Sequence, residues 1–192
     1  MTQNKFHYLG NVFGLLIICA ILVLSFIDQL IGHDFPCPLC LLQRTAFVGI
    51  GLCLCMNIKN GIKTSNYGLM LLTSVLGFSV ALRQVFLHVA PGDPGFGPPL
   101  LGLHLYNWSA IVFMFIVGLV GIGLCMNNAF QPKVEKTRKL VTGLMILFLL
   151  LILGNGVSTF LECGVMICPA NPVQYDLLSF SELQSIGAEL SS

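Results

Sequence analysis

Charge is scarce in this chain. Only 9% of its 192 residues are Asp, Glu, Lys or Arg, whereas a soluble domain carries about 25%. Hydrophobic residues make up 56% of the chain. This composition excludes an ordinary soluble domain and predicts an integral membrane protein. The sequence also lacks a basic stripe or a dense Lys/Arg cluster facing aromatic residues, so we expect no nucleic-acid partner.

Long apolar runs account for most of the chain. Five of them approach or exceed the roughly 20 residues that a helix needs to cross a bilayer. They lie near 8–27, 38–57, 67–90, 103–126 and 140–161. The predicted fold class is therefore all-α, a polytopic membrane helix bundle. We expect residues 1–161 to form the bundle and residues 162–192 a tail, with no segment long enough for a separate globular domain.

The few charges are sorted by segment. Basic residues occur at the N-terminus and in segments 58–66 and 127–139, namely Lys5, Lys59, Lys63, Lys133, Lys136, Arg138 and Lys139. Segments 28–36 and 91–102 and the tail contain acidic residues and no Lys or Arg. Because basic connecting segments stay in the cytoplasm, we predict a cytoplasmic N-terminus and a C-terminal tail on the outer side.

Eight cysteines are distributed unevenly over this topology. Cys37 and Cys40 lie at the outer end of the second span, and Cys163 and Cys168 lie just past the outer end of the fifth. Two close pairs of thiols therefore face the same oxidising compartment. The remaining cysteines, Cys19, Cys53, Cys55 and Cys125, lie within spans, where we interpret them as small apolar packing residues.

The first pair has the surroundings of a reactive dithiol. Pro38 suits the first position of a helix, which predicts Cys37 as the cap and places Cys40 in the first turn. Unpaired N–H groups and the positive end of the helix dipole favour a thiolate there. Arg44 shares the helical face of both cysteines by its spacing. A thiolate beside a fixed cation is what thiol–disulfide exchange requires.

A second arginine is predicted at a similar depth. Arg83 lies near the outer end of the third span, about as far below the rim as Arg44. Because a charge is costly in hydrocarbon, we expect both arginines to line a polar pocket between the second and third spans. A quinone head group would suit that pocket, since its carbonyls accept hydrogen bonds from guanidinium groups. The alternative is that either arginine reaches out to the lipid head groups.

Three groups of residues resemble the DsbB family of bacterial disulfide-bond formation proteins. They are the stretch from Pro36 to Cys40 with Arg44, the stretch from Arg83 to Val85, and Leu101–Leu103 with Trp108. The resemblance spans roughly residues 8–126 and implies a four-helix core like that of the family, to which this chain adds a fifth helix. The Cys–Arg motif carries most of its specificity.

The resemblance implies an activity and two partners. Members of the family are inner-membrane quinone reductases that reoxidise DsbA, a thioredoxin-like protein of the periplasm, and they use ubiquinone or menaquinone. By this resemblance Cys37 and Cys40 are the quinone-facing pair and Arg44 is the quinone-site arginine. Arg83 lies near another quinone contact of the family, although that match is looser.

One departure from the family concerns its second cysteine pair, which normally lies between the third and fourth spans. Segment 91–102 is short and has no cysteine. The predicted topology returns Cys163 and Cys168 to the outer side, where they could receive electrons from the partner and pass them to Cys37 and Cys40. The other interpretation of Cys163 and Cys168 is a structural disulfide that pins the tail.

Three other interpretations compete with this hypothesis. One is a purely structural membrane protein whose outer disulfides only stabilise it, and Arg44 and Arg83 argue against that. A transmembrane reductant conduit would use Cys19, Cys53, Cys55 or Cys125 as an internal relay, but those positions lack a proline-flanked, charged setting. A metal-binding membrane protein would hold Cu(I) or zinc through the four outer thiols. No histidine stands at ligand spacing to these thiols, so we predict no metal site.

Overall fold

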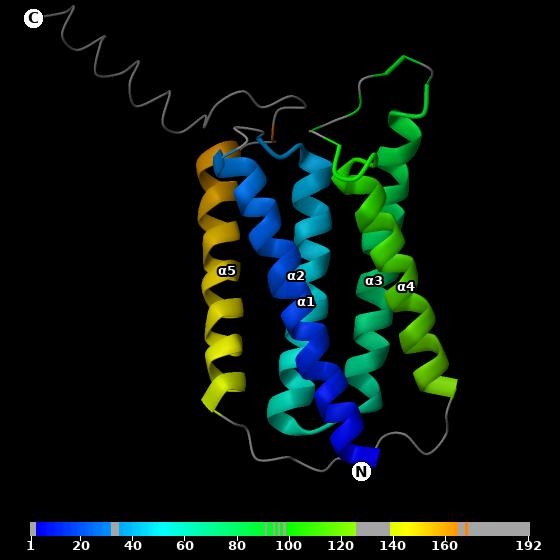
Figure 1. Cartoon of the computed structure of the whole chain (residues 1–192), viewed down its shortest axis with the longest axis vertical. Helices are drawn as coiled ribbons and strands as arrows, with labels where there is room; N and C mark the ends of the chain where they lie inside the picture. Colours follow the sequence, from blue (N-terminus) through cyan, green and yellow to red (C-terminus); the bar gives the residue numbers. More distant parts are fainter. Residues whose placement is uncertain are drawn as a thin grey trace, which may run out of the picture.

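Five long helices make up the described chain. The computed structural model describes residues 3–31, 35–90, 92, 93, 95, 97, 99–125, 139–164 and 168. The helices, in chain order, are α1 (Gln3–Ile31), α2 (Pro38–Asn60), α3 (Thr64–Leu87), α4 (Leu105–Cys125) and α5 (Lys139–Cys163) (Figure 1). Apart from an isolated bridge between Leu100 and Leu103, these residues form no β-structure.

Each helix is long and apolar enough to cross a membrane. The prediction of an all-α polytopic bundle is therefore confirmed, and the protein is a multi-pass membrane protein. Most helix ends differ from the predicted bounds by a few residues, and two of these differences bear on the site. Helix α1 runs on to Ile31, so Asp28 is helical, and α5 runs past 161 to Cys163, so Glu162 belongs to the bundle. Most of the predicted tail lies outside the described residues.

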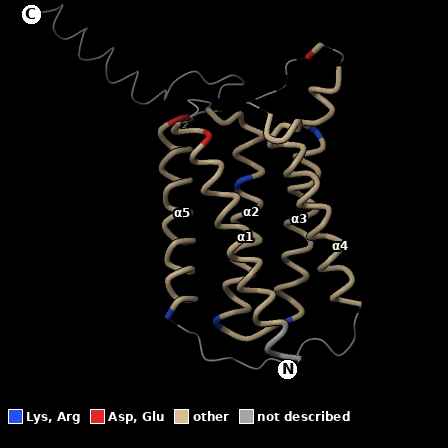
Figure 2. The backbone as a smooth tube through the Cα atoms, in the orientation of Figure 1, with Lys and Arg blue, Asp and Glu red and all other residues tan. Residues whose placement is uncertain are grey.

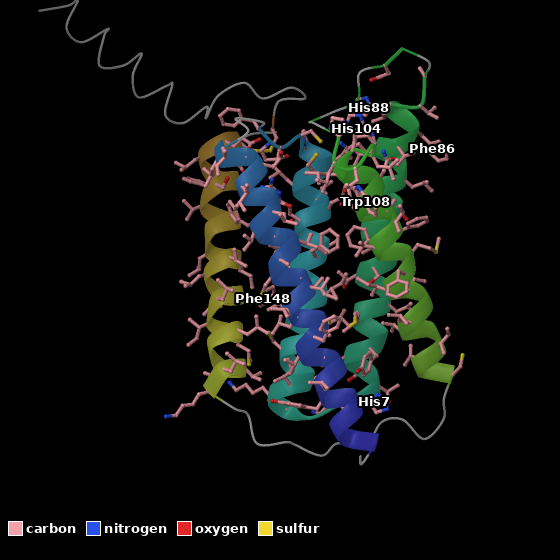
Figure 3. All side chains as sticks on the ribbon, in the orientation of Figure 1. His7, Phe86, His88, His104, Trp108 and Phe148 are labelled. Atoms are coloured by element: carbon pink, nitrogen blue, oxygen red, sulfur yellow. A yellow bond between two sulfur atoms is a disulfide. The ribbon has the colours of Figure 1, made fainter. Side chains whose placement is uncertain are left out.

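The helices pack side by side in the order α4, α3, α2, α1, α5, and α5 also contacts α2. Helix α3 contacts both α4 and α2, α2 contacts α1, and α5 packs on α1 and α2 at the other side of the bundle (Figure 1). Gly51 makes the contact between α2 and α5 possible, because a Cβ atom there would run into the ring of Phe148. Phe148 is buried at 2% exposure and points from α5 into the bundle (Figure 3).

Charge is separated along the bundle axis. Among the described residues, Lys59, Lys63 and Lys139 lie near the end that bears the N-terminus, and the acidic residues lie at the other end (Figure 2). We call this second end, where α2 begins with the cysteine pair, the dithiol end. Arg44 and Arg83 are basic residues near the acidic end, which sets them apart from every other described Lys or Arg.

Candidate active site

The cysteine pair lies at the start of α2. Cys37 is the N-cap residue and Pro38 follows at the first helical position, as predicted. The Cys40 backbone N–H donates to Cys37 Sγ at 3.2 Å, and the two Sγ atoms are 2.6 Å apart. Cys37 is 7% exposed. The two sulfurs are therefore positioned to close a disulfide with little movement of the backbone.

Protonation differs between the two sulfurs. The hydrogen bond with Cys40, assisted by burial, raises the pKa of Cys37 well above its ordinary value. The pair therefore keeps its proton on Cys37 when it is reduced. Cys40, in the first turn of α2, is left as the sulfur that bears negative charge, and it is the less buried of the two.

A pair of glutamine side chains supports the sulfurs from below. Gln84 of α3 is 1% exposed, and its Nε2 lies 3.4 Å from the Sγ of both Cys37 and Cys40. Its Oε1 accepts a hydrogen bond of 2.7 Å from Gln43 Nε2, which fixes the orientation of the amide. Gln84 thus offers an N–H donor to whichever sulfur is negative.

Arg44 lies one helical turn below Cys40 and is 9% exposed. Its Nη1 donates to Gln29 Oε1 at 2.7 Å and its Nη2 donates to the Ser25 carbonyl at 2.8 Å, so the guanidinium is held against α1. Phe26, also on α1, has its ring centroid 5.8 Å from the guanidinium carbon, within the range of a cation–π contact. The charge is therefore buried and fixed in place.

Two cavities meet at Arg44. The smaller, of about 60 Å³, is also lined by Cys40, Gln43, Asp28 and Tyr106. The larger, of about 530 Å³, is an open groove between α2 and α5. Cys40 lines only the smaller cavity, so the smaller cavity is the one in which a ligand could contact this sulfur. We call the smaller one the Cys40 cavity and the larger one the α5 groove.

The second cysteine pair lies at the mouth of the α5 groove. Cys163 and Cys168 are joined by a disulfide. Cys163 is the last residue of α5 and is buried, whereas Cys168 is partly exposed. Both line the groove together with Arg44. The structure therefore brings the two cysteine pairs to the same end of the bundle, with Arg44 lining a cavity beside each.

Arg83 is placed differently from Arg44. It lies on the exposed side of α3 and lines neither cavity, although its neighbour Gln84 contacts the dithiol. The two arginines therefore do not share a pocket, and Arg44 lies against α1, not between α2 and α3. The exposed position of Arg83 is suited to the lipid head-group region.

The connection between α3 and α4 borders the Cys40 cavity. His88, His104 and Trp108 gather there (Figure 3), and Gly97 and Tyr106 line the cavity itself. His104 stacks on Tyr106 with centroids 5.4 Å apart. The Trp108 indole donates to the Leu100 carbonyl at 3.0 Å. These contacts hold an aromatic wall beside Cys40.

Asp93 organises the tip of this connection. Its Oδ1 accepts a hydrogen bond of 2.8 Å from the Gly95 N–H and lies 3.1 Å from His88 Nδ1. The Gly95 N–H, and after it His88, hold the pKa of the Asp93 carboxyl below its usual range. The carboxylate is exposed, so it belongs to the surface of the site and not to its buried part.

The other four cysteines lie away from these two pairs. Cys19 and Cys53 are buried in the apolar core, Cys55 is partly buried beside it, and Cys125 is exposed at the end of α4. None of them lines either cavity. In the part of the chain that the structure describes, no group of three His, Cys, Asp or Glu residues is placed to hold a metal ion.

Sequence reasoning missed the roles of three residues of this site. Gln84 is a buried amide inside the predicted third span, Gln29 is a buried amide just past the predicted end of the first span, and Glu162 is a carboxylate with no exposed surface at the end of α5. A polar residue inside a span is a signal in itself. That signal could have identified Gln84, whereas Gln29 and Glu162 were hidden because the first and fifth spans were predicted to end at 27 and 161.

Comparison with known proteins identifies a family. The family model described as "Disulfide bond formation protein DsbB" matches residues 9–96. Relatives named "Disulfide bond formation protein B" include one from Marinobacter nauticus, 36% identical over 161 residues, covering 64% of this chain and 94% of the relative. One from Hahella chejuensis is 34% identical over 110 residues, covering 54% and 67% respectively. No solved structure matches the chain.

Proposed function

Because this chain belongs to the DsbB family and is a disulfide oxidoreductase of the membrane, we propose that it oxidises a periplasmic DsbA-type dithiol and reduces ubiquinone or menaquinone. The observation that carries this proposal is the Cys40 cavity, in which a sulfur and a buried guanidinium line the same space. A thiolate there has both a cation beside it and an opening toward a bound oxidant.

The lining of the Cys40 cavity suits a quinone ring. Arg44 and Gln43 offer N–H donors for carbonyl oxygens, while Phe47, Leu105 and the Tyr106 ring offer apolar contact. When bound, the quinone would supply the oxidising power by accepting two electrons and two protons. Arg44 would hold one carbonyl oxygen and stabilise the negative charge that develops on it.

The two sulfurs of the first pair take different roles. Cys40 faces the cavity and gives up its electrons, because Cys37 retains the proton of the reduced pair. Cys37 then loses that proton and closes the disulfide with Cys40. Gln84 keeps both sulfurs within reach of each other and donates to the negative one.

Electrons reach this pair from the second one. A partner thiolate attacks Cys168, the more exposed sulfur, and Cys163 leaves as a thiolate into the α5 groove. The second partner thiol then resolves the mixed disulfide, so the partner leaves oxidised. The reduced Cys163–Cys168 pair attacks the Cys37–Cys40 disulfide in the same way, and the dithiol at α2 is regenerated.

Sidedness completes the proposal. The basic residues near the N-terminal end and the acidic residues at the dithiol end support an inner-membrane protein with its N-terminus in the cytoplasm. In that orientation both cysteine pairs and the C-terminal tail face the periplasm, where a thioredoxin-like partner can reach them. The helices α1 to α5 are surrounded by membrane lipid.

The test is an oxidation assay in detergent. Purified protein should oxidise a reduced thioredoxin-like dithiol only when quinone is added, and quinol should form in equal amount. Cys163→Ser/Cys168→Ser should lose oxidation of the partner but still pass electrons from Cys37 and Cys40 to quinone. Full partner oxidation by that variant would remove the second pair from the route, and failure with every quinone would overturn the function.

A matched variant addresses the conduit alternative. Replacing Cys19, Cys53, Cys55 and Cys125 together by serine or alanine should leave quinone-dependent oxidation in place, because none of the four lines either cavity. Loss of electron transfer in this variant, at unchanged folding, would favour an internal relay instead.

A further inference from the structure

The half of α5 nearest the dithiol end carries a polar stripe. Asn155, Ser158, Thr159 and Glu162 follow one another at helical spacing, after a long apolar run in the middle of the helix. Asn155 and Thr159 line the α5 groove. A helix that served only as an anchor would not need polar residues along one face, because each is unfavourable in hydrocarbon. This face of α5 is therefore part of the site.

Hydrogen bonds connect the stripe to Arg44. Gln29 of α1 lies between the two, since its Oε1 accepts from Arg44 Nη1 and its Nε2 donates to Ser158 Oγ, both at 2.7 Å. Glu162 follows Ser158 by one helical turn on the same face of α5. It has no exposed surface and interacts electrostatically with the Arg44 guanidinium. A buried carboxylate thus belongs to the environment of the buried cation.

The charges around Arg44 change during turnover. With the first pair oxidised, its sulfurs carry no charge, and the guanidinium is faced by the carboxylates of Glu162 and Asp28. Reduction adds a thiolate at Cys40 beside the same cation. The Cys40 thiolate, Glu162 and the partly exposed Asp28 then share one cation in a region of low dielectric, and this favours protonation of one of the three. The thiolate is required for reaction with the oxidant, so one of the two carboxylates is the group that can be neutralised.

We propose that Glu162 stores a proton: it takes one up when the Cys37–Cys40 pair is reduced and releases it when that pair is reoxidised. This inference rests on the proposed function. It adds α5, which lies outside the range matched by the family model, to the redox machinery. Glu162 acts through Arg44 and the charge balance, not by contact with the quinone.

Atoms and electrons balance over the cycle. The donor dithiol gives two electrons, which break the Cys37–Cys40 bond, and two protons. One proton is kept as the Cys37 thiol, the second goes to Glu162, and Cys40 remains a thiolate. On reoxidation the S–S bond re-forms, two electrons go to the quinone, and the protons of Cys37 and Glu162 leave with them.

Other ionisable groups also face Arg44. They are Asp28 from α1, Cys37 and Cys40 from α2, Tyr106 from α4 across the Cys40 cavity, and Cys163 beside Glu162 at the end of α5. Asp28 is the competing carboxylate, but it is partly exposed and lines the Cys40 cavity. A partly exposed carboxylate stays charged more easily than one with no exposed surface, which favours Glu162.

Infrared difference spectroscopy tests the proposal directly. The spectrum of protein reduced by a small-molecule reductant, minus that of the oxidised protein, should contain a protonated-carboxyl C=O band. The band should vanish in Glu162→Gln, shift in frequency in Glu162→Asp, and persist in Asp28→Asn and Asp93→Asn. No quinone is present, so this result does not depend on quinone reduction.

Each outcome decides the point. A band that persists in Glu162→Gln but vanishes in Asp28→Asn would assign the proton to Asp28 and overturn the proposal. A reduced protein without any such band would do the same. If Glu162→Gln does not fold, the frequency shift in Glu162→Asp decides alone, and an unshifted band there contradicts Glu162 as its source. Failure of the quinone assay with the band intact would instead overturn the proposed function.

Discussion

Each end of the bundle contains a buried polar cluster, and the two clusters differ in kind. At the end remote from the cysteine pairs, Asn57 Nδ2 donates to Asn11 Oδ1 at 3.0 Å, and Asn11 Nδ2 donates to the Tyr67 hydroxyl at 2.7 Å. Asn66 Nδ2 donates to Asn57 Oδ1 at 2.8 Å. This amide cluster joins α1, α2 and α3 through neutral groups.

The cluster at the dithiol end joins the same three helices and adds charge and sulfur. Arg44 bonds to α1, and Gln84 of α3 contacts Cys37 and Cys40 of α2. Polar side chains therefore hold α1, α2 and α3 together at both ends, and the amide cluster shows that neutral groups are sufficient for this. The buried cation and the two thiols of this sulfur cluster need another reason, and redox chemistry supplies it.

The largest difference between the clusters should appear on removing the cation. Arg44→Met should lower the rate of quinone reduction by about 100-fold or more, because a preorganised positive donor beside the developing charge is lost. The rate is measured as quinol formation from reduced protein. Arg83→Met is the matched control, and its rate should stay within about twofold because Arg83 is exposed. Equal losses in both variants would place Arg83 in the site.

A smaller effect is expected from the amide beneath the sulfurs. Gln84→Leu removes the Nε2 donor, and one hydrogen bond to a charged sulfur is worth about 1.5 kcal/mol. Alkylation of the reduced dithiol at neutral pH should therefore slow by about tenfold. Gln43→Leu should have a weaker effect, since Gln43 only orients Gln84. An unchanged alkylation rate in Gln84→Leu would remove Gln84 from the control of the sulfurs.

Mutation of the amide cluster should lower the stability of the protein and leave its rate of quinone reduction unchanged. Asn57→Leu leaves its partners Asn11, Asn66 and the Lys63 backbone N–H without one hydrogen bond each, which should lower the free energy of unfolding by about 1–3 kcal/mol. Thermal unfolding in detergent measures the loss. Quinone reduction per folded molecule should not change. A specific loss of activity would mean that the two ends are coupled, and the contrast between them would fail.

The smallest effect is expected at the surface of the dithiol end. The pKa of Asp93 is lowered by the Gly95 N–H and by His88. Its interactions are therefore complete above the unfolded-state pKa and are lost only as the pH falls through the lowered folded-state value. Asp93→Asn removes these interactions at neutral pH, but Asp93 is exposed and lines neither cavity, so quinone reduction should not change. A neutral-pH defect in this variant would show that the loop tip contributes to turnover.

Local sequence signals were sufficient to predict the five helices and the residue that caps α2. Hydropathy located all five spans, and the Cys37–Pro38 pair located the cap, because both depend only on nearby residues. The joint position of Cys37, Cys40 and Arg44 on one helical face follows from the same local geometry.

The rotation and length of the helices could not be predicted in the same way. Arg83 and Gln84 are adjacent, so a rotation of α3 by about 100° decides which of them faces the sulfurs. The packing of α3 on α2 and α4 sets that rotation. The contact of Arg44 with α1, and of Glu162 with the bundle, depends on how α1 and α5 dock, which no single stretch of sequence contains.

One measurement tests the central claim most directly. Cys163→Ser/Cys168→Ser protein is reduced, freed of reductant and mixed with quinone, and the thiols of Cys37 and Cys40 are counted as quinol forms. We predict that both thiols disappear together with stoichiometric quinol, and that Arg44→Met slows the reaction. Thiols that persist in the presence of ubiquinone and of menaquinone would contradict a dithiol poised by Arg44 to reduce quinone.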